Sequence, residues 1–394
     1  MSVIKKFIFA FLVILLGGLI YYSSLSPLKK NLAKNKILHW THILSPDWEI
    51  NVSKEDDGYV ANLNSPSLLV DGIYNSMKGP VAYKMFLLDE NEDELYWVTG
   101  LDVKANSKYD SKGSSDDLIC HVNLYHSPVE HFSRMGMEER IDIQLSQLIT
   151  LTKGGLFFEF PEGFGYPLYS NEKIYVGSQV LNLNLKNPLF TVDYDFKLKY
   201  IKDKEKRLKP LYMRYVVLVL PYDAANEKIN DIIKKNESEG EKVRCAIPRG
   251  ENHGYNSFDE KRVPTTAFWI VPKGKHTYRS NFTKVLALDT IETVHKINTH
   301  VHPYATSLEI RDITADSTIF KSIITNHKDR IGIDSITSFS SVKGVKMYPD
   351  HEYELVEEVD NTSGKESEMM ASMFLYFYDH KLDKKIDSLQ LKQH

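Results

Sequence analysis

The chain has 394 residues, of which 42% are hydrophobic and 26% charged, and its formal net charge is −4. This composition is typical of a globular protein that is long enough for two domains with cores of their own. The negative charge, with no basic stripe interleaved with aromatic residues, argues against nucleic acid as a partner. The basic run at 202–209 (KDKEKRLK) is therefore interpreted as a solvated link between domains.

The N-terminal segment joins a pair of lysines to an unbroken apolar run over residues 7–22. That pattern is typical of a secretory signal or a signal anchor. Pro27 disfavours cleavage at the nearest small-residue site, and paired tyrosines at the end of the run suit a membrane interface. We therefore expect residues 1–26 to form an uncleaved, single-pass membrane anchor, with the rest of the chain exported to a periplasmic or extracellular space.

Beyond the anchor, apolar segments rich in Val, Tyr, Phe and Leu alternate with turn-rich pieces, as in β-sandwich proteins. The predicted strands include 94–103, 155–160, 212–221, 266–271, 284–289, 352–359 and 370–379. We expect an all-β fold of two tandem jelly-roll-like β-sandwich domains, at 27–205 and 206–394. An apolar stripe at 224–235 predicts one helix, which we interpret as part of an insertion at about 222–264.

A pair of histidines stands out in the stretch NTHVHPYATSLEIRD. Residues two apart on a strand point to the same side, so His300 and His302 could both reach one ion. Taken alone, the pair is better explained as two histidines that share a surface or packing face by coincidence. Met369 and Met370 lie just before a late apolar strand, where core methionines would also be expected. Together, two imidazoles and a thioether suit copper that cycles through Cu(I), and they suit Mg²⁺ or Ca²⁺ poorly.

These motifs resemble those of the copper type II, ascorbate-dependent monooxygenases, such as peptidylglycine α-hydroxylating monooxygenase and dopamine β-monooxygenase. The family's C-terminal domain has an H-x-H strand and, downstream, a Glu-Met step that opens a final strand; here these are THVHP and SEMMASMFLYF. Further similar stretches are FWIVPKGKHTYRSNFT, FEFPEGFGYPLYSNEKIYVGSQVLNLNLKNP and LICHVNLYH, so the resemblance extends in order over most of residues 90–380.

The resemblance implies that His300, His302 and Met369 hold a copper ion that binds O₂ and takes hydrogen from a substrate carbon. It also implies an external reductant such as ascorbate. In the family, a second copper is held by three histidines in the N-terminal domain. Those positions fall here on Cys120, His121 and Asn184, and an amide oxygen is a weak copper ligand.

Two readings of this second site stay open. Cys120 and His121 are adjacent and would point to opposite faces of a regular strand. A β-bulge, or recruitment of His126 or His131, could restore a second copper site; alternatively, this half has lost its copper. Cys120 and Cys245 could also form a disulfide in an oxidising compartment.

Two functions are therefore expected. The first is an anchored, exported copper-dependent monooxygenase that acts on an unidentified small-molecule or peptide substrate. The second is a non-catalytic double β-sandwich of the same descent that binds copper or another ligand, or acts in envelope adhesion.

Overall fold

The computed structural model describes residues 3–55, 57–76, 78–107, 115–141, 143–186, 189–222, 257–258 and 263–390. Over these residues the fold is all-β with one N-terminal apolar helix, which confirms the predicted fold class. The proposed helix at 224–235, most of the insertion at 222–264, and Cys245 lie outside the described residues.

The helices are α1 (Val3–Ser24), α2 (Pro27–Trp40), α3 (Pro128–Arg134), α5 (Thr283–Leu286) and α6 (His380–Gln390). The strands are β1 (Glu49–Glu55), β2 (Gly58–Asn64), β3 (Leu68–Val70), β4 (Val81–Phe86), β5 (Leu95–Ser107), β6 (Ile119–His126), β7 (Gln147–Thr152), β8 (Phe157–Glu159), β9 (Phe164–Tyr169), β10 (Ile174–Val180), β11 (Phe190–Lys202), β12 (Lys209–Val217), β13 (Leu220–Pro221), β14 (Ser257–Phe258), β15 (Pro264–Thr266), β16 (Trp269–Val271), β17 (Gly274–Asn281), β18 (Glu292–Val301), β19 (Ala305–Asp312), β20 (Ser317–Asn326), β21 (Ile333–Ile336), β22 (Phe339–Met347), β23 (Tyr353–Asn361), β24 (Ser367–Met369) and β25 (Ala371–Tyr378).

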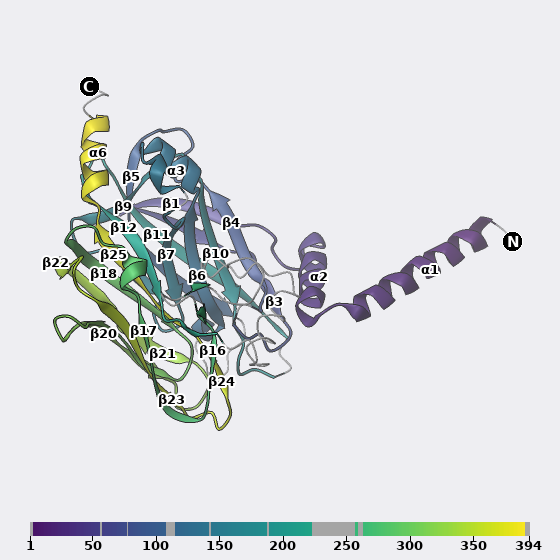
Figure 1. Cartoon of the computed structure of the whole chain (residues 1–394). Coiled ribbons are helices and arrows are strands. Elements are labelled where there is room, and N and C mark those ends of the chain that lie inside the picture. The colour runs from purple at the N-terminus through teal and green to yellow at the C-terminus, as the bar shows by residue number, and fades with distance from the viewer. Residues whose placement is uncertain are drawn as a thin grey trace.

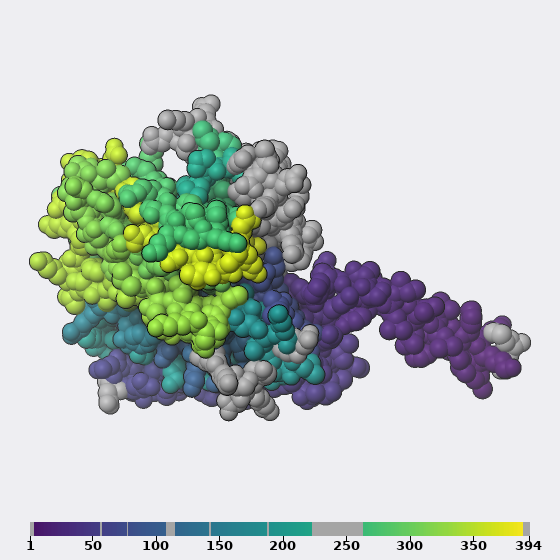
Figure 2. Space-filling view, turned by 90° about the horizontal axis from the view of Figure 1, so that it is seen from below, coloured from purple at the N-terminus to yellow at the C-terminus, as the bar shows by residue number. Residues whose placement is uncertain are grey.

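An eleven-stranded sheet runs through both halves of the molecule in the order β1-β2-β11-β5-β9-β12-β25-β18-β22, with β3 and β8 paired at its side. In the N-terminal half, the sheet β4-β10-β6-β7 packs against it around one hydrophobic core. In the C-terminal half, the sheet β17-β23-β19-β20-β21 packs against it around a second core. Each half is therefore a sandwich of two sheets (Figure 1), and Figure 2 shows the green and yellow C-terminal half lying against the blue and teal N-terminal half.

The long strand β11 shows how the sequence produces these layers. Its side chains alternate strictly between the core and the outside, so that one face of the strand is apolar. The buried members are Phe190, Val192, Tyr194, Phe196, Leu198 and Tyr200. The basic segment at 202–209 then connects β11 to β12, between the two halves.

The two sandwiches share strands at their boundary. β9 and β12 pair in parallel, with Phe164 opposite Lys209. β25 is buried on both faces, because Met373 and Leu375 enter the C-terminal core while Phe374 and Tyr376 enter the N-terminal core. Contacts between the sandwiches are therefore made by the backbone as well as by side chains.

One predicted strand is wrong. Residues 284–289 begin inside the short helix α5 and leave it at Ala287, whose backbone is left-handed (φ 43°). Only Leu286 of this helix is buried, so the segment lacks the alternating apolar face that a strand needs.

The apolar helix α1 projects away from the sandwiches (Figure 1). Its stretch Ile4–Ser24 is exposed along its length and is long and apolar enough to cross a membrane, a test that signal sequences also pass. The next helix, α2, is fixed to the N-terminal sandwich. Asn31 donates from Nδ2 to the carbonyl of Leu69 (2.9 Å), and Asn35 accepts from the Leu69 N–H (2.7 Å).

Candidate functional site

The predicted histidine pair lies at the end of β18, on the face toward the N-terminal sandwich. His300 pairs with Ser372 of β25, and His302 follows directly after the strand, with its N–H donating to the Met370 carbonyl (3.2 Å). Both imidazoles are 8% exposed, and their ring centroids are 5.7 Å apart. The spacing of two therefore does place both rings on one face.

The environment of the pair leaves ring nitrogens available. Burial lowers the pKa of both imidazoles, and the neighbouring histidines lower the pKa of His300 further, so both are neutral near pH 7. Neither ring nitrogen of His300 has a hydrogen-bond partner. His302 donates from Nδ1 to the Glu368 carbonyl in a long bond (3.4 Å). Its Nε2 is therefore unprotonated and can bind a metal ion.

The two methionines lie on different faces of the chain. Met369 pairs with Trp269 and is fully buried in the C-terminal core. Continuing the β18–β25 register places Met370 opposite His302, on the face of His300 and Ser372. Directly opposed residues in an antiparallel pair project to the same side. A role for Met369 as a ligand stays a prediction, and the register favours Met370 as the thioether near the histidines.

A β-bulge brings residues of β6 toward the same region. On β10, Gln179 pairs with His121 and Val180 pairs with Ile119, so Cys120 is the extra residue of the bulge. A bulge can turn two successive side chains toward one side. Cys120 lines the pocket that also contains the histidine pair, and His121 lies close enough to His300 to lower the pKa of His300. Burial lowers the pKa of His121 itself to about 4.

The side chain of Asn184 bonds to backbone through both of its polar atoms. Its Nδ2 donates to the Ile331 carbonyl (2.9 Å), and its Oδ1 accepts from the Ile331 N–H (3.0 Å). Arg330 in the same loop donates from Nε to Asp117 (2.6 Å). Asn184 therefore holds the β20–β21 loop against the N-terminal sandwich, and its amide points at backbone, which disfavours it as a metal ligand.

These elements enclose a pocket of about 290 Å³ between the two sandwiches. Its walls include Cys120, His300, His302, Tyr304, Ile333 and Glu368. Among the described residues, His300 and His302 are not part of any group of three His, Cys, Asp or Glu ligand atoms that all lie within 4.8 Å of one another. An ion on the pair would therefore complete its ligands from a thioether, from water or substrate, or from Cys120 after a small movement.

A different group of donors was missed by sequence reasoning. His126, His131 and Glu172 come together within 4.8 Å, and all are buried. The sequence suggested His126 and His131 only as substitutes at the second copper site. That recruitment does not occur, because five residues of strand separate His126 from His121, about 17 Å at 3.3 Å per residue. The Ser127-Pro128 step between His126 and His131 is typical of a helix start and was the available signal, whereas nothing in the sequence pointed to Glu172.

No family model and no curated protein sequence matches this chain. Among solved structures it is similar to PNGF-II, with a TM-score of 0.27 and 10% identity, covering 80% of this chain and 66% of that chain. It is also similar to a structure described as a "putative secreted protein" from Parabacteroides distasonis, with a TM-score of 0.22 and 10% identity, covering 85% of this chain and 93% of that chain. Likeness at this level carries no argument about activity, which must come from the site.

Proposed function

We propose that the chain is an exported, membrane-anchored copper protein in which His300 and His302 hold a redox-active ion beside a substrate pocket. The observation that carries the proposal is the state of His300. Both of its ring nitrogens are buried and without hydrogen-bond partners, beside a second imidazole with an unprotonated Nε2. A buried polar atom without a partner costs about 1–3 kcal/mol, and ligation to a metal ion would remove that cost.

The donor chemistry favours copper over harder ions. Neutral imidazoles with a thioether and a thiol nearby suit Cu(I) and Cu(II), whereas Mg²⁺ and Ca²⁺ prefer oxygen ligands. Copper bound in such a set can exchange single electrons with a reductant and activate O₂. The reaction proposed is hydroxylation of a substrate C–H bond, in which one oxygen atom enters the substrate and the other leaves as water. It consumes two protons and two electrons from a reductant of the ascorbate class.

Several residues would have specific roles in the proposed reaction. The Glu368 carbonyl orients His302, and the strand pairing with Ser372 fixes the direction of His300. The β20–β21 loop, held by Asn184, forms one wall of the pocket. The substrate would be a small molecule or an extended peptide end that fits about 290 Å³. The apolar helix α1 would anchor the sandwiches at the membrane surface from which they project.

Copper loading tests the proposal directly. The full chain in detergent is loaded with Cu(I) under ascorbate, excess metal is removed, and bound copper per chain is measured. The native chain should retain one copper that the double variant His300→Ala/His302→Ala loses. The control is His295→Gln on the same strand, where Nδ1 already bonds the Ser341 carbonyl (3.0 Å) and should not matter for copper. Equal copper in the native chain and the double variant, or none in either, rejects the proposal.

One observation favours the non-catalytic alternative. Asn184, which occupies the third position of the expected second copper site, is bonded to Ile331 through both polar atoms. A single copper without this electron-supplying partner could serve binding alone. Oxygen uptake by the copper-loaded chain with ascorbate separates the two functions. Uptake that depends on His300 supports oxygen activation, and binding without uptake supports the copper-binding protein.

A further inference from the structure

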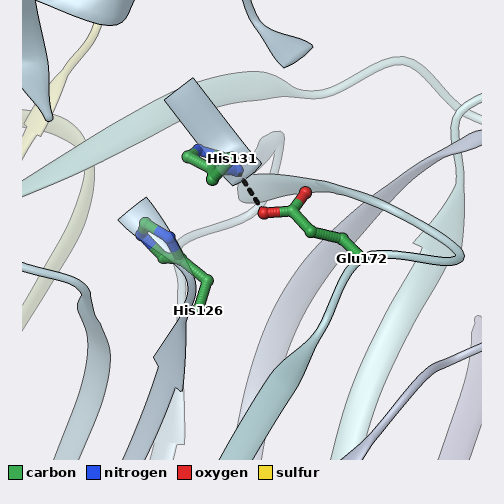
Figure 3. A group of neighbouring side chains, drawn as sticks. All are labelled: His126, His131 and Glu172. Carbon is green, nitrogen blue, oxygen red and sulfur yellow. Dashed lines mark ion pairs between the residues drawn. The ribbon is translucent and has the colours of Figure 1, made fainter. Parts of the chain in front are cut away.

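Three buried side chains converge in the N-terminal sandwich (Figure 3). His126 is the last residue of β6, His131 lies on α3, and Glu172 lies in the turn between β9 and β10. Their exposed fractions are 2%, 0% and 0%. One ligand atom from each lies within 4.8 Å of the other two.

Local structure brings the three together. Ser127 caps α3 by accepting from the Glu130 N–H (3.4 Å), so the chain turns into the helix immediately after His126. One helical turn further on, the ring of His131 lies 4.3 Å from that of His126, measured between centroids. Glu172 is fixed because one of its oxygens, Oε2, accepts from the Tyr169 N–H (3.2 Å). The other oxygen is left for the histidines.

The atoms that face the centre of this cluster lack hydrogen bonds. They are Nδ1 of His126, Nδ1 of His131 and Oε1 of Glu172. The last two are 2.9 Å apart but do not have the alignment of an N–H···O hydrogen bond. Three buried polar atoms without a hydrogen bond in one dry place are uncommon, because each such atom costs folding free energy unless something satisfies it.

Tyr166 contacts both imidazoles at the Nε2 edge, opposite Nδ1. Its hydroxyl lies 3.0 Å from Nε2 of His126 and 3.5 Å from Nε2 of His131. In the tautomer in which each Nε2–H points to the tyrosine oxygen, both Nδ1 atoms are unprotonated and can bind an ion, and Nδ1 of His131 lies 2.9 Å from Oε1 of Glu172. Metal-binding histidines are held in this way, with the second ring nitrogen bonded to a fixed oxygen.

We propose that His126, His131 and Glu172 form a structural site for a divalent transition-metal ion of the zinc class. Two imidazoles and one carboxylate are ligands that Zn²⁺ accepts, at about 2.0–2.2 Å, and a bound water molecule would be the fourth ligand of a tetrahedral ion. Zn²⁺ has no redox chemistry, so it can be held in a site that neither solvent nor a reductant reaches. The carboxylate would also gain a cation in a region where an unpaired charge is costly.

The ion would connect the end of β6, α3 and the β9–β10 turn. Phe132, next to His131, packs in a small hydrophobic cluster with Trp97 and with Leu382 of α6. Fixing α3 through His131 would therefore also support the packing of the C-terminal helix. The role is structural, and it is independent of the proposed copper pocket.

Metal uptake by the full chain in detergent tests the site. After stripping with a chelator, the chain is titrated with Zn²⁺ in competition with a chromophoric chelator, and Co²⁺ is used as a spectroscopic probe. The native chain should bind one Zn²⁺, show the visible absorption of tetrahedral Co²⁺, and melt at a higher temperature when loaded. A native chain that takes up neither ion overturns the proposal.

Two variants locate the ion. Glu172→Gln keeps the side-chain shape and the bond to Tyr169 but removes the charge, and it should weaken Zn²⁺ binding at least about 100-fold. Tyr166→Phe removes only the orienting hydroxyl and should weaken binding about 10–100-fold. If Glu172→Gln does not fold, Tyr166→Phe carries the comparison. Unchanged affinity in the folded variants overturns the site.

The control is His300→Ala/His302→Ala, which should bind Zn²⁺ at this cluster as the native chain does. Loss of Zn²⁺ in that variant, with retention in Glu172→Gln, would place the ion in the copper pocket and reject the cluster. The copper experiment and the zinc experiment can therefore fail separately.

Discussion

Individual histidines in this chain differ in which groups their ring nitrogens contact. His39 bonds the Ser67 carbonyl through Nε2 (2.7 Å), and His295 bonds the Ser341 carbonyl through Nδ1 (3.0 Å). His300 is buried, as His295 is, but has a hydrogen-bond partner at neither nitrogen. A structural histidine is ordinarily satisfied by its surroundings, so an unsatisfied one in a pocket indicates a ligand.

Substituting each of the two adjacent methionines in turn tests which thioether binds the proposed copper. Met370→Leu should weaken Cu(I) binding about tenfold, equal to about 1.4 kcal/mol, because the thioether on the face of His302 is lost. Met369→Leu removes a thioether from the C-terminal core and should leave copper affinity unchanged. Its cost in stability should stay below about 1.5 kcal/mol, as for similar core exchanges. Competition with a Cu(I) chelator measures both variants, and the reverse ranking would show that the register argument is wrong.

Sequence could predict the shared face of His300 and His302, because a spacing of two fixes direction on any strand. It could not choose between Met369 and Met370, because a shift of one residue exchanges the two faces. Only the pairing of β25 with β18 decides that question. The same limit applies to Glu172, which lies more than 40 positions from His126 in the chain and meets it only through the sheet order.

At the scale of elements, the pocket depends on two irregular features. The bulge at Cys120 turns the start of β6 toward the histidines, and the β20–β21 loop crosses from the C-terminal sandwich to the N-terminal one. The loop is held by Asn184 and by Asp117, which pairs with Lys153 (2.7 Å) and Arg330 (2.6 Å). The bulge is one of the alternatives that the sequence allows, but a loop docked across two domains leaves no local sequence pattern.

Removing the amide of Asn184 should loosen this loop. Asn184→Ala deletes two hydrogen bonds to Ile331 and should lower stability by about 1–3 kcal/mol. Amide hydrogen exchange at 327–333 should become faster, and copper should dissociate faster from the opened pocket.

Asn182→Ala is the matched control for that experiment. Asn182 is two residues away and bonds Gly72 (2.8 Å) and Leu185 (3.0 Å), both within the N-terminal sandwich. It should cost similar stability without faster exchange at 327–333. Equal exchange in the two variants would mean that Asn184 does not hold the loop.

At the scale of the whole molecule, the two sandwiches behave as one packed body because β25 contributes to both cores. The sequence predicted strand-rich halves on either side of the basic link, since alternation and turns are local signals. The sharing of a strand is a long-range property that those signals do not contain. It implies that buried ionisable groups in one half affect the unfolding of both sandwiches together.

Two buried groups should therefore shape the pH dependence of unfolding. Burial raises the pKa of Glu357 to about 8, and both of its carboxylate oxygens lack hydrogen bonds. Burial lowers the pKa of Lys296 to about 8. Between about pH 4.5 and 8 the folded state binds more protons than the unfolded state at Glu357, so stability falls as pH rises. Between about pH 8 and 10.5 the unfolded state binds more protons at Lys296, so stability rises again.

Denaturant unfolding of the full chain in detergent at several pH values should accordingly show a stability minimum near pH 8. Each limb should span a few kcal/mol at most, at about 1.4 kcal/mol per pH unit for one group. Glu357→Gln should flatten the acidic limb and leave the basic limb, because the amide does not titrate. Lys296→Met should do the opposite. If both variants follow the native curve in parallel over the whole range, these two groups are not the source of the pH dependence.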